Sequence, residues 1–184
     1  MRLKLQCHPA TPCTAVQGIE VKVSRHAGAV LELHYFVTGE IRDVRIPEPC
    51  EAQRADRLWE HSCFEAFVRS EGQSTYHEIN LSPSSEWAAY RFGAYRSGMQ
   101  LPPGITPPII GLRATAKTFV LHSHISLPGL PGLREGAPWR LGLSAVIEEM
   151  NGTKSYWALA HPPGKPDFHH GDCFARTLPP PEAL

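Results

Sequence analysis

The chain contains CFEAFVR at residues 63–69, YHEINLS at 76–82 and WAAYRFGAY at 87–95. Alternate residues in these runs are apolar, which is typical of β-strands with one face turned toward a core. Matching the apolar faces of the first two runs sets Phe64 opposite Leu81 and Ala66 opposite Ile79. A slip of one residue would bury the polar set, so this register is strongly preferred. The three runs therefore predict neighbouring antiparallel strands.

The rest of the chain continues the same pattern. Eight further runs have strand length and little helical period: 2–7, 19–23, 30–37, 41–46, 109–114, 118–127, 139–149 and 154–161. The 18 prolines and 15 glycines make up about 18% of the chain, against an average near 12%, and favour short elements separated by turns. About eleven strands predict an all-β fold, an antiparallel β-sandwich of the jelly-roll or immunoglobulin-like kind.

Length and charge limit the organisation and the function. The 184 residues suit one domain, and we expect it to span 1–178, with a frayed tail over 179–184. The 18 basic residues balance 18 acidic ones, which argues against a dedicated nucleic-acid binder. No apolar run is long enough to cross a membrane. The sequence leaves the oligomeric state open.

The five cysteines stand at positions 7, 13, 50, 63 and 173. Their number is odd, their spacing is wide, and no C-x-x-C motif occurs, so neither a zinc ribbon nor a thioredoxin-like site is expected. The N-terminal residues lack the apolar stretch of a secretory signal. We therefore expect reduced thiols and a cytoplasmic protein.

The register of the three central runs gathers polar and aromatic side chains on one sheet face. We expect this face to carry Glu65, Glu78, Asn80, Trp87, Arg91, Tyr76 and Arg69. Aromatic rings stack on the C–H groups of sugar rings, and carboxylate, amide and guanidinium groups bind vicinal hydroxyls. The alternative is an ordinary solvated face with cross-strand Glu–Arg pairs. Glu65 is the sharpest candidate because it interrupts a strand that is otherwise apolar on both sides.

Several motifs are more specific than this alternation. They are RLWEHSCFEAF at 57–67, YHEINLSP at 76–83, WAAY at 87–90, YR at 95–96, YWAL at 156–159 and KPDFHH at 165–170. Over roughly residues 1–178 the chain resembles the bacterial DOMON-like domain proteins, which are related to the family 9 carbohydrate-binding modules. The resemblance implies a β-sandwich whose concave face binds a ligand, a sugar or haem in the wider superfamily.

The resemblance also implies roles for individual residues. In the carbohydrate-binding modules a tryptophan stands six residues before a glutamate on a strand, and Trp59 and Glu65 have this spacing. Asn80 and Arg91 would fill polar roles, and one of Tyr156 or Trp157 would stack on the ligand; we take Trp157. Unlike the secreted modules, the chain shows no signal peptide and no attached catalytic domain.

We therefore expect a non-catalytic protein, without a cofactor, that binds a small carbohydrate-like ligand on a concave sheet face. The expected ligand-binding residues are Trp59, Glu65, Glu78, Asn80, Trp87, Arg91 and Trp157.

Two other functions stay open. A haem-binding domain would need an axial ligand, for which His61, His77 and His161 are the best placed; covalent attachment is excluded because no C-x-x-C-H motif occurs. A glycosidase-like enzyme would use Glu65 and Glu78. These glutamates are diagonal neighbours in the proposed register, with their Cα atoms about 7–8 Å apart. This separation is in the range of the two carboxyl groups of an inverting glycosidase.

A metal site is a weaker possibility. His122 and His124 stand two residues apart, so both rings point to one side of a strand, as in some zinc sites. Asp167 with His169 and His170 could supply a third ligand. We expect instead that His122 and His124 lie on the solvent side of an outer strand.

Overall fold

The computed structural model describes residues 1–181 and confirms the all-β prediction, with 48% strand and 5% helix. The strands are β1 (Arg2–Cys7), β2 (Val16–His26), β3 (Val30–Gly39), β4 (Cys63–Ser70), β5 (Tyr76–Leu81), β6 (Trp87–Phe92), β7 (Ile109–Ala114), β8 (Thr118–Ser126), β9 (Trp139–Glu148), β10 (Lys154–Ala158) and β11 (Arg176–Leu178). Three short 3-10 turns complete the described structure: η1 (Ile41–Asp43), η2 (Leu58–Glu60) and η3 (Gly171–Cys173). Within residues 1–181, no helix has the length and hydropathy needed to span a bilayer.

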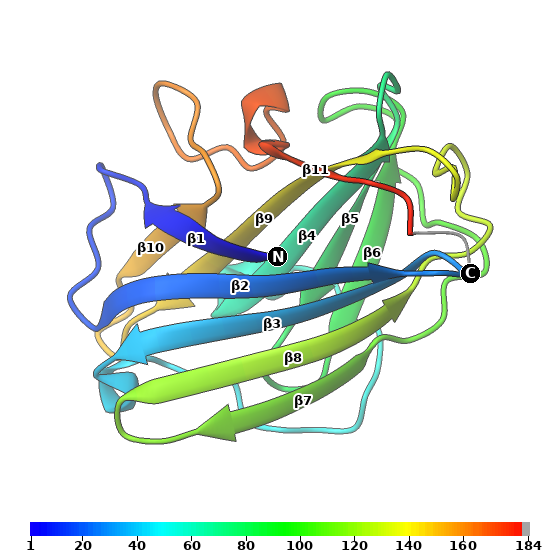
Figure 1. The fold of residues 1–184 in the computed structure, drawn as a ribbon. Coiled ribbons are helices and arrows are strands. Elements are labelled where there is room, and N and C mark those ends of the chain that lie inside the picture. The colour runs from blue at the N-terminus through cyan, green and yellow to red at the C-terminus, as the bar shows by residue number, and fades with distance from the viewer. Residues whose placement is uncertain (182–184) are drawn as a thin grey trace.

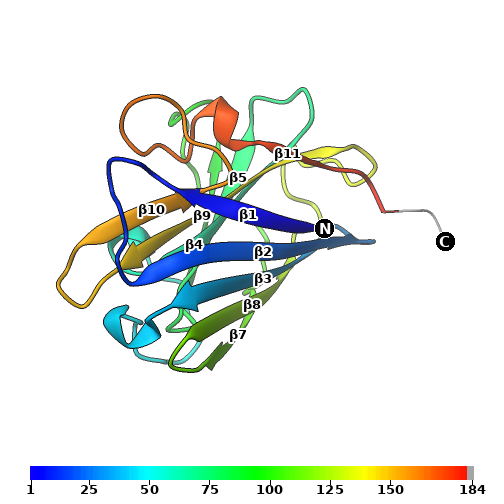
Figure 2. The ribbon, with the colours of Figure 1, turned by 60° about the vertical axis from the view of Figure 1, so that its left-hand side comes forward.

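The strands form one antiparallel sheet that curls over itself. Their order is β6-β5-β4-β9-β10-β1-β2-β3-β8-β7, and β11 lies beside β9. Strands β1, β2, β3, β8 and β7 make a front layer, while β10, β9, β4, β5 and β6 make a back layer (Figures 1 and 2). Strand β1 connects the layers, because its first residues pair with β2 and its end pairs with β10. The result is the predicted β-sandwich.

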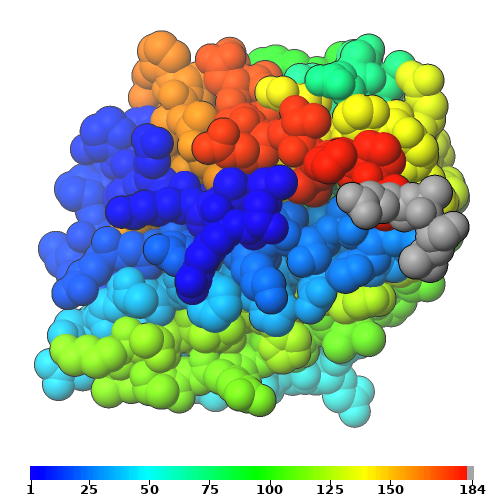
Figure 3. Space-filling view, viewed as in Figure 1, coloured from blue at the N-terminus to red at the C-terminus, as the bar shows by residue number. Residues whose placement is uncertain are grey.

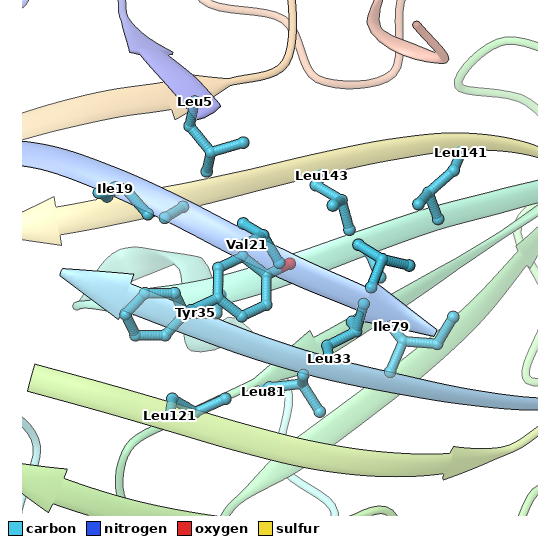
Figure 4. Packing of buried hydrophobic residues seen from close by; sticks show 14 of the residues in the cluster. Leu5, Ile19, Val21, Leu33, Tyr35, Ile79, Leu81, Leu121, Leu141 and Leu143 are labelled. Carbon is cyan, nitrogen blue, oxygen red and sulfur yellow. The ribbon is translucent and has the colours of Figure 1, made fainter. Parts of the chain in front are cut away.

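The main hydrophobic core lies between the two layers. Val21, Leu33 and Tyr35 point inward from the front layer, and Ile79 and Leu143 meet them from the back layer (Figure 4). Each of these residues is at most 1% exposed, so the alternation seen in the sequence is the alternation of burial. The outer surface of the front layer is covered by close-packed side chains of residues 1–40 and 109–126 (Figure 3).

The back layer is buried on both of its faces. All residues of β5, and all but one of β4, are buried. A second apolar cluster covers the outer face of this layer and includes Phe67, Tyr76, Phe92 and Phe174. Turn η2, the loop after β6 and the segment 162–175 supply the cover, and they enclose polar side chains that a solvated sheet would leave in water.

Two details of the strand prediction were wrong, although the total of eleven was right. Residues 41–46 do not form a strand. Ile41–Asp43 form turn η1 and Val44 makes an isolated bridge to Glu149, because Ile41 and Val44 are buried three residues apart, as in one 3-10 turn. Strand β11, which pairs with β9, was not predicted. Of the tail at 179–184, residues 182–184 lie outside the described residues, while the Pro179 carbonyl accepts a hydrogen bond from Arg25 (3.1 Å).

Candidate ligand-binding site

A cavity of about 590 Å³ lies on the outer face of the back layer. Its floor comes from five strands and its walls from three loops: Glu65, Glu78, Tyr90, Phe92, Val146 and Tyr156 on strands, and Trp59, Arg96, Met99, Pro166, Phe168 and His169 on loops. Trp59 and Met99 are 40% and 62% exposed. These two side chains therefore lie at the rim of the cavity. A volume of this size is typical of small-molecule sites.

The strand register brings the two glutamates of the floor onto one face. Glu65 pairs with Asn80, and Glu78 pairs with Phe67 on one side and Tyr90 on the other. Residues directly opposite each other, and residues two apart along a strand, point to the same side. The predicted register of β4 and β5 is thus confirmed, and Glu65, Glu78 and Asn80 lie together.

The two carboxylates are deeply buried and have few partners. Glu65 is 3% exposed, and the Ser144 hydroxyl donates to its Oε2 at 3.3 Å. Glu78 is 5% exposed, and Asn80 Nδ2 donates to its Oε1 at 2.7 Å. Burial, followed by the charge of Glu78, raises the pKa of Glu65 well above its usual range, and burial raises the pKa of Glu78 to about 7. The pair therefore holds at least one proton near neutral pH.

His169 presents a hydrogen-bond donor to the same floor. The Tyr76 hydroxyl accepts the backbone N–H of Arg96 at 3.2 Å and lies 2.8 Å from His169 Nδ1. The Tyr76 proton then points to Nδ1, which leaves the proton of the neutral ring on Nε2. That nitrogen lies 3.6 Å from Glu78 Oε2. Burial and the nearby Arg96 charge lower the pKa of His169 to about 4, so the ring is neutral at pH 7.

An ion pair joins the two loops over the cavity. Arg96 donates from Nη2 (2.8 Å) and Nε (3.2 Å) to Asp167 Oδ1, and the Tyr95 hydroxyl donates to Asp167 Oδ2. The His169 backbone N–H also donates to Asp167, at 3.1 Å. The loop after β6 is therefore held against the segment that carries His169. Because this contact fixes Arg96 at the wall, its guanidinium offsets a small part of the rise that burial causes in the pKa of both glutamates.

Aromatic rings make up much of the remaining lining of the cavity. Trp59 and Tyr90 make an edge-on contact with ring centroids 6.1 Å apart, and Tyr156 and Phe168 lie 6.0 Å apart. The Tyr90 hydroxyl donates to Asp56 at 2.5 Å, which holds the ring in place. Flat apolar surfaces at the walls and polar groups at the floor suit a ligand with both C–H faces and hydroxyl groups.

Not all of the expected residues face this cavity. Trp59, Glu65 and Glu78 line it, and Asn80 supports Glu78 from beneath. Trp87 pairs with Leu81 and Arg91 pairs with His77, so both point to the other face of the sheet. The expectation that they lie beside Glu65 is therefore wrong.

The phase of β6 explains this error. WAAYRF carries an aromatic residue on each face, so alternation alone does not decide which face is which. The structure places Tyr90 and Phe92, not Trp87, at the cavity. Arg91 instead donates to Gln100 Oε1 at 3.0 Å, and Arg96 is the arginine at the wall.

On β10 the outward residue is Tyr156. Trp157 is 5% exposed and belongs to the core between the layers, where its Nε1 donates to Ser155 at 3.0 Å. The choice of Trp157 over Tyr156 as a cavity residue is therefore wrong. Arg96 and His169 were not expected at the site, although both fall within the sequence motifs YR and KPDFHH.

The metal and haem candidates lie elsewhere. His122 stacks on His34 with centroids 5.9 Å apart in the front layer, and His124 stands opposite Glu32. Asp167 and His169 lie across the back layer and do not join them. Within the described residues no group of three or more His, Cys, Asp or Glu side chains could hold a metal ion.

None of the three histidines considered for haem is among the residues that line the described cavity. His61 contacts Glu148 at 2.7 Å, His77 contacts the Pro131 carbonyl at 3.0 Å, and His161 contacts the Gln6 carbonyl at 2.8 Å. A haem held by one of them stays a prediction.

Comparisons with known proteins extend the description of the fold. No protein-family model matches the chain, and no curated protein sequence matches it. A protein of Bacteroides uniformis ATCC 8492, for which carbohydrate binding has been suggested, is similar in structure with a TM-score of 0.67 and 16% identity, covering 94% of this chain and 83% of that one. This likeness shows a shared fold.

Two further structures are more distant. They are of a family 9 carbohydrate-binding module from Caldicellulosiruptor kristjanssonii, bound to glucose (10% identity) and to cellotriose (11% identity), each with a TM-score of 0.47. They cover 87% and 88% of this chain, and 76% and 75% of their own. At these scores they say nothing about the ligand of this protein.

Proposed function

We propose that this protein binds a small carbohydrate-like ligand in the cavity of the back layer and does not transform it. One observation carries the proposal: two buried carboxylates, Glu65 and Glu78, lie at the floor of an aromatic-walled cavity of about 590 Å³. Charged acceptors with few internal partners bind hydroxyl groups strongly, and aromatic walls bind the C–H faces of a sugar ring. The fold shared with the Bacteroides uniformis protein agrees with this function.

The polar groups offer both donors and acceptors. Glu78 accepts, a protonated Glu65 donates or accepts, and neutral His169 donates from Nε2. Vicinal hydroxyls of a sugar are themselves donors and acceptors, so each finds a partner at this floor. A purely apolar ligand would leave the two carboxylates desolvated without compensation, at a cost of several kcal/mol.

Calorimetric titration with a panel of mono- and disaccharides tests the proposal. We expect at least one sugar to bind the wild-type protein. Glu65→Gln should weaken that sugar about 3- to 10-fold, the scale of a hydrogen bond made by a neutral group. Glu71→Gln is the matched control, because Glu71 is an exposed turn residue away from the cavity. Equal affinities in these two variants would refute the role of Glu65.

Trp59 allows a second, independent check. Its ring is 40% exposed at the rim, so Trp59→Ala should leave the fold intact and weaken the sugar by about 3- to 10-fold. Ile109→Ala is the control, since Ile109 is an exposed apolar residue on β7 of the other layer.

A glycosidase-like reaction is the second candidate function. Glu65 and Glu78 share one floor, and burial separates their pKa values from those of ordinary carboxyl groups, as in enzymes that use one acid and one base. Incubation with aryl glycosides decides between the two. Release of phenol that disappears in both Glu65→Gln and Glu78→Gln would replace binding by hydrolysis, and a binding protein releases none.

A further inference from the structure

Acidic side chains outnumber basic ones around the cavity, and binding of a neutral sugar does not explain this excess. Glu65, Glu78 and Asp167 contribute three carboxyl groups, whereas Arg96 is the one guanidinium among the described lining residues. Arg96 is itself engaged by Asp167 through two hydrogen bonds, at 2.8 and 3.2 Å. The positive charge of Arg96 is therefore balanced by Asp167, and the two acidic groups of the floor, Glu65 and Glu78, make no ion pair with it.

Among residues 1–181, no lysine or arginine makes an ion pair with the two acids of the floor. The structure gives Glu65 a hydroxyl partner, Ser144 at 3.3 Å, and Glu78 an amide partner, Asn80 at 2.7 Å. His169 approaches Glu78 at 3.6 Å as a neutral ring. Each carboxylate offers about four acceptor sites, so most of this capacity faces no protein donor. Buried acids without a cationic partner are costly, and such sites in proteins are completed by a paired charge.

The walls favour a cation as well. Tyr90, Phe92 and Tyr156 rise from the strands beside the two glutamates, and Trp59 and Phe168 face them from the loops. An ammonium group within about 6 Å of such rings is attracted to their faces, and the attraction is larger in a site that excludes water. Two acids beneath an aromatic enclosure form the combination that binds organic ammonium groups.

We infer that the ligand is an amino sugar, whose protonated amine lies between Glu65 and Glu78 while its ring contacts the aromatic walls. This inference rests on the carbohydrate-binding function proposed above and names its ligand class. The cavity of about 590 Å³ is larger than a small alkylamine needs, and His169 and Arg96 remain available to ring hydroxyls. An anionic sugar would instead face two carboxylates across the floor.

Matched pairs of sugars test this inference on the full-length protein. Glucosamine is compared with glucose, and galactosamine with galactose, by calorimetry at about pH 7.5. This pH lies above the pKa of Glu78, about 7, and below that of an amine of this kind, which is near the α-amino value of about 8. The amino sugar of at least one pair should bind about 10- to 100-fold more tightly than its neutral partner. N-acetylglucosamine, which keeps the nitrogen but carries it as an uncharged amide, should lose this advantage.

Variants of the cavity acids test whether Glu65 and Glu78 cause the preference for amino sugars. Glu65→Gln and Glu78→Gln should each reduce the ratio of amino-sugar to neutral-sugar affinity toward one, whereas Glu71→Gln should leave it unchanged. A ratio is used because a variant that folds less well lowers both affinities together. A ratio that is the same in the wild type and in both cavity variants would overturn the inference.

The remaining outcomes separate this inference from the proposed function. Equal binding of amino and neutral sugars would overturn the inference and leave carbohydrate binding intact. Binding of ethanolamine as tight as that of glucosamine would overturn the sugar part of the assignment. If neither member of any pair binds, and the wider sugar panel also fails, both conclusions fall.

Discussion

At the scale of single residues, Glu65 is the most informative side chain of the cavity, and the sequence already marked it as unusual. Glu65 interrupts a strand that is apolar on both faces, and this pattern alone marked it as unusual. The structure shows why the pattern is tolerated: the outer face of β4 is covered by loops, and Glu65 faces the cavity they enclose. Its neighbour Glu78 is buried for the same reason. The proton of this pair makes the stability of the protein depend on pH.

Glu78 carries the first prediction. Its pKa is raised from about 4.5 in the unfolded chain to about 7 in the folded protein. The stability contributed by the protonated group is therefore complete below about pH 4.5 and is lost as the pH rises through about 7. Glu78→Gln removes this loss, so the variant should exceed the wild type by about 1–3 kcal/mol in free energy of unfolding at pH 8, and match it near pH 4.

Urea unfolding of both proteins across this pH range measures the effect. Glu71→Gln should follow the wild-type curve at every pH, because the side chain of Glu71 is exposed. A Glu78→Gln variant that is less stable than the wild type at pH 8 would show that the carboxylate is held by favourable partners and that its burial is not the dominant influence.

At the scale of elements, periodicity predicted strands well and their phase less well. Strands β4 and β5 each have one clearly apolar face, so the register between them was predicted correctly. Strand β6 has Trp87 on one face and Tyr90 on the other, and both faces are buried. A strand buried on both sides has no polar face to mark its phase, and the arginine at the cavity was misassigned as a result.

The two arginines give a direct test of this phase. Arg91 lies on the face of Ile79 and Leu81, whereas Arg96 lines the cavity. Arg91→Ala should leave ligand affinity within a factor of about two of the wild type, while Arg96→Ala should weaken it by about 10-fold through the loss of a charged hydrogen-bond donor and of the contact with Asp167. Calorimetry with the best-binding sugar measures both. The reverse order of effects would restore the phase expected from the sequence.

Loops limited the prediction more than strands did. Arg96, Phe168 and His169 reach the cavity only because the loop after β6 meets the segment before η3, through Asp167. The contact between Arg96 and Asp167 joins residues about 70 positions apart in the chain. Contacts at this sequence separation cannot be predicted from the periodicity of neighbouring residues. Their presence in distinctive motifs was the available signal. The strand predicted over 41–46 was wrong for a simpler reason, since a 3-10 turn such as Ile41–Asp43 and a short strand both have apolar residues at close spacing.

At the scale of the whole molecule, the two-layer fold determines which cysteine thiols are exposed to reagents in solution. All five cysteines are free in the described structure. Cys50 is exposed, while Cys63 and Cys173 are buried at 0% and 3%. Burial raises the pKa of Cys173 to about 12 and that of Cys63 well above its usual range, and a thiol reacts as its thiolate.

Thiol titration checks this arrangement. In the native protein Cys50 should react first with a disulfide reagent, and Cys63 and Cys173 only on the timescale of unfolding. In denaturant without reductant all five should titrate. A Cys50→Ser variant that keeps the fast phase would contradict the assignment, and a denatured count below five would show that a disulfide forms in solution.

We propose that the outer face of the back layer, and not the open face of the front layer, holds the ligand. Backbone amide shifts in a two-dimensional NMR spectrum, recorded during titration with the best-binding sugar, test it most directly. We expect the largest shifts at Glu65, Glu78, Tyr90 and His169, with β2, β3 and β8 almost unchanged. Shifts concentrated on β2, β3 and β8, with the cavity residues unmoved at saturation, would contradict it.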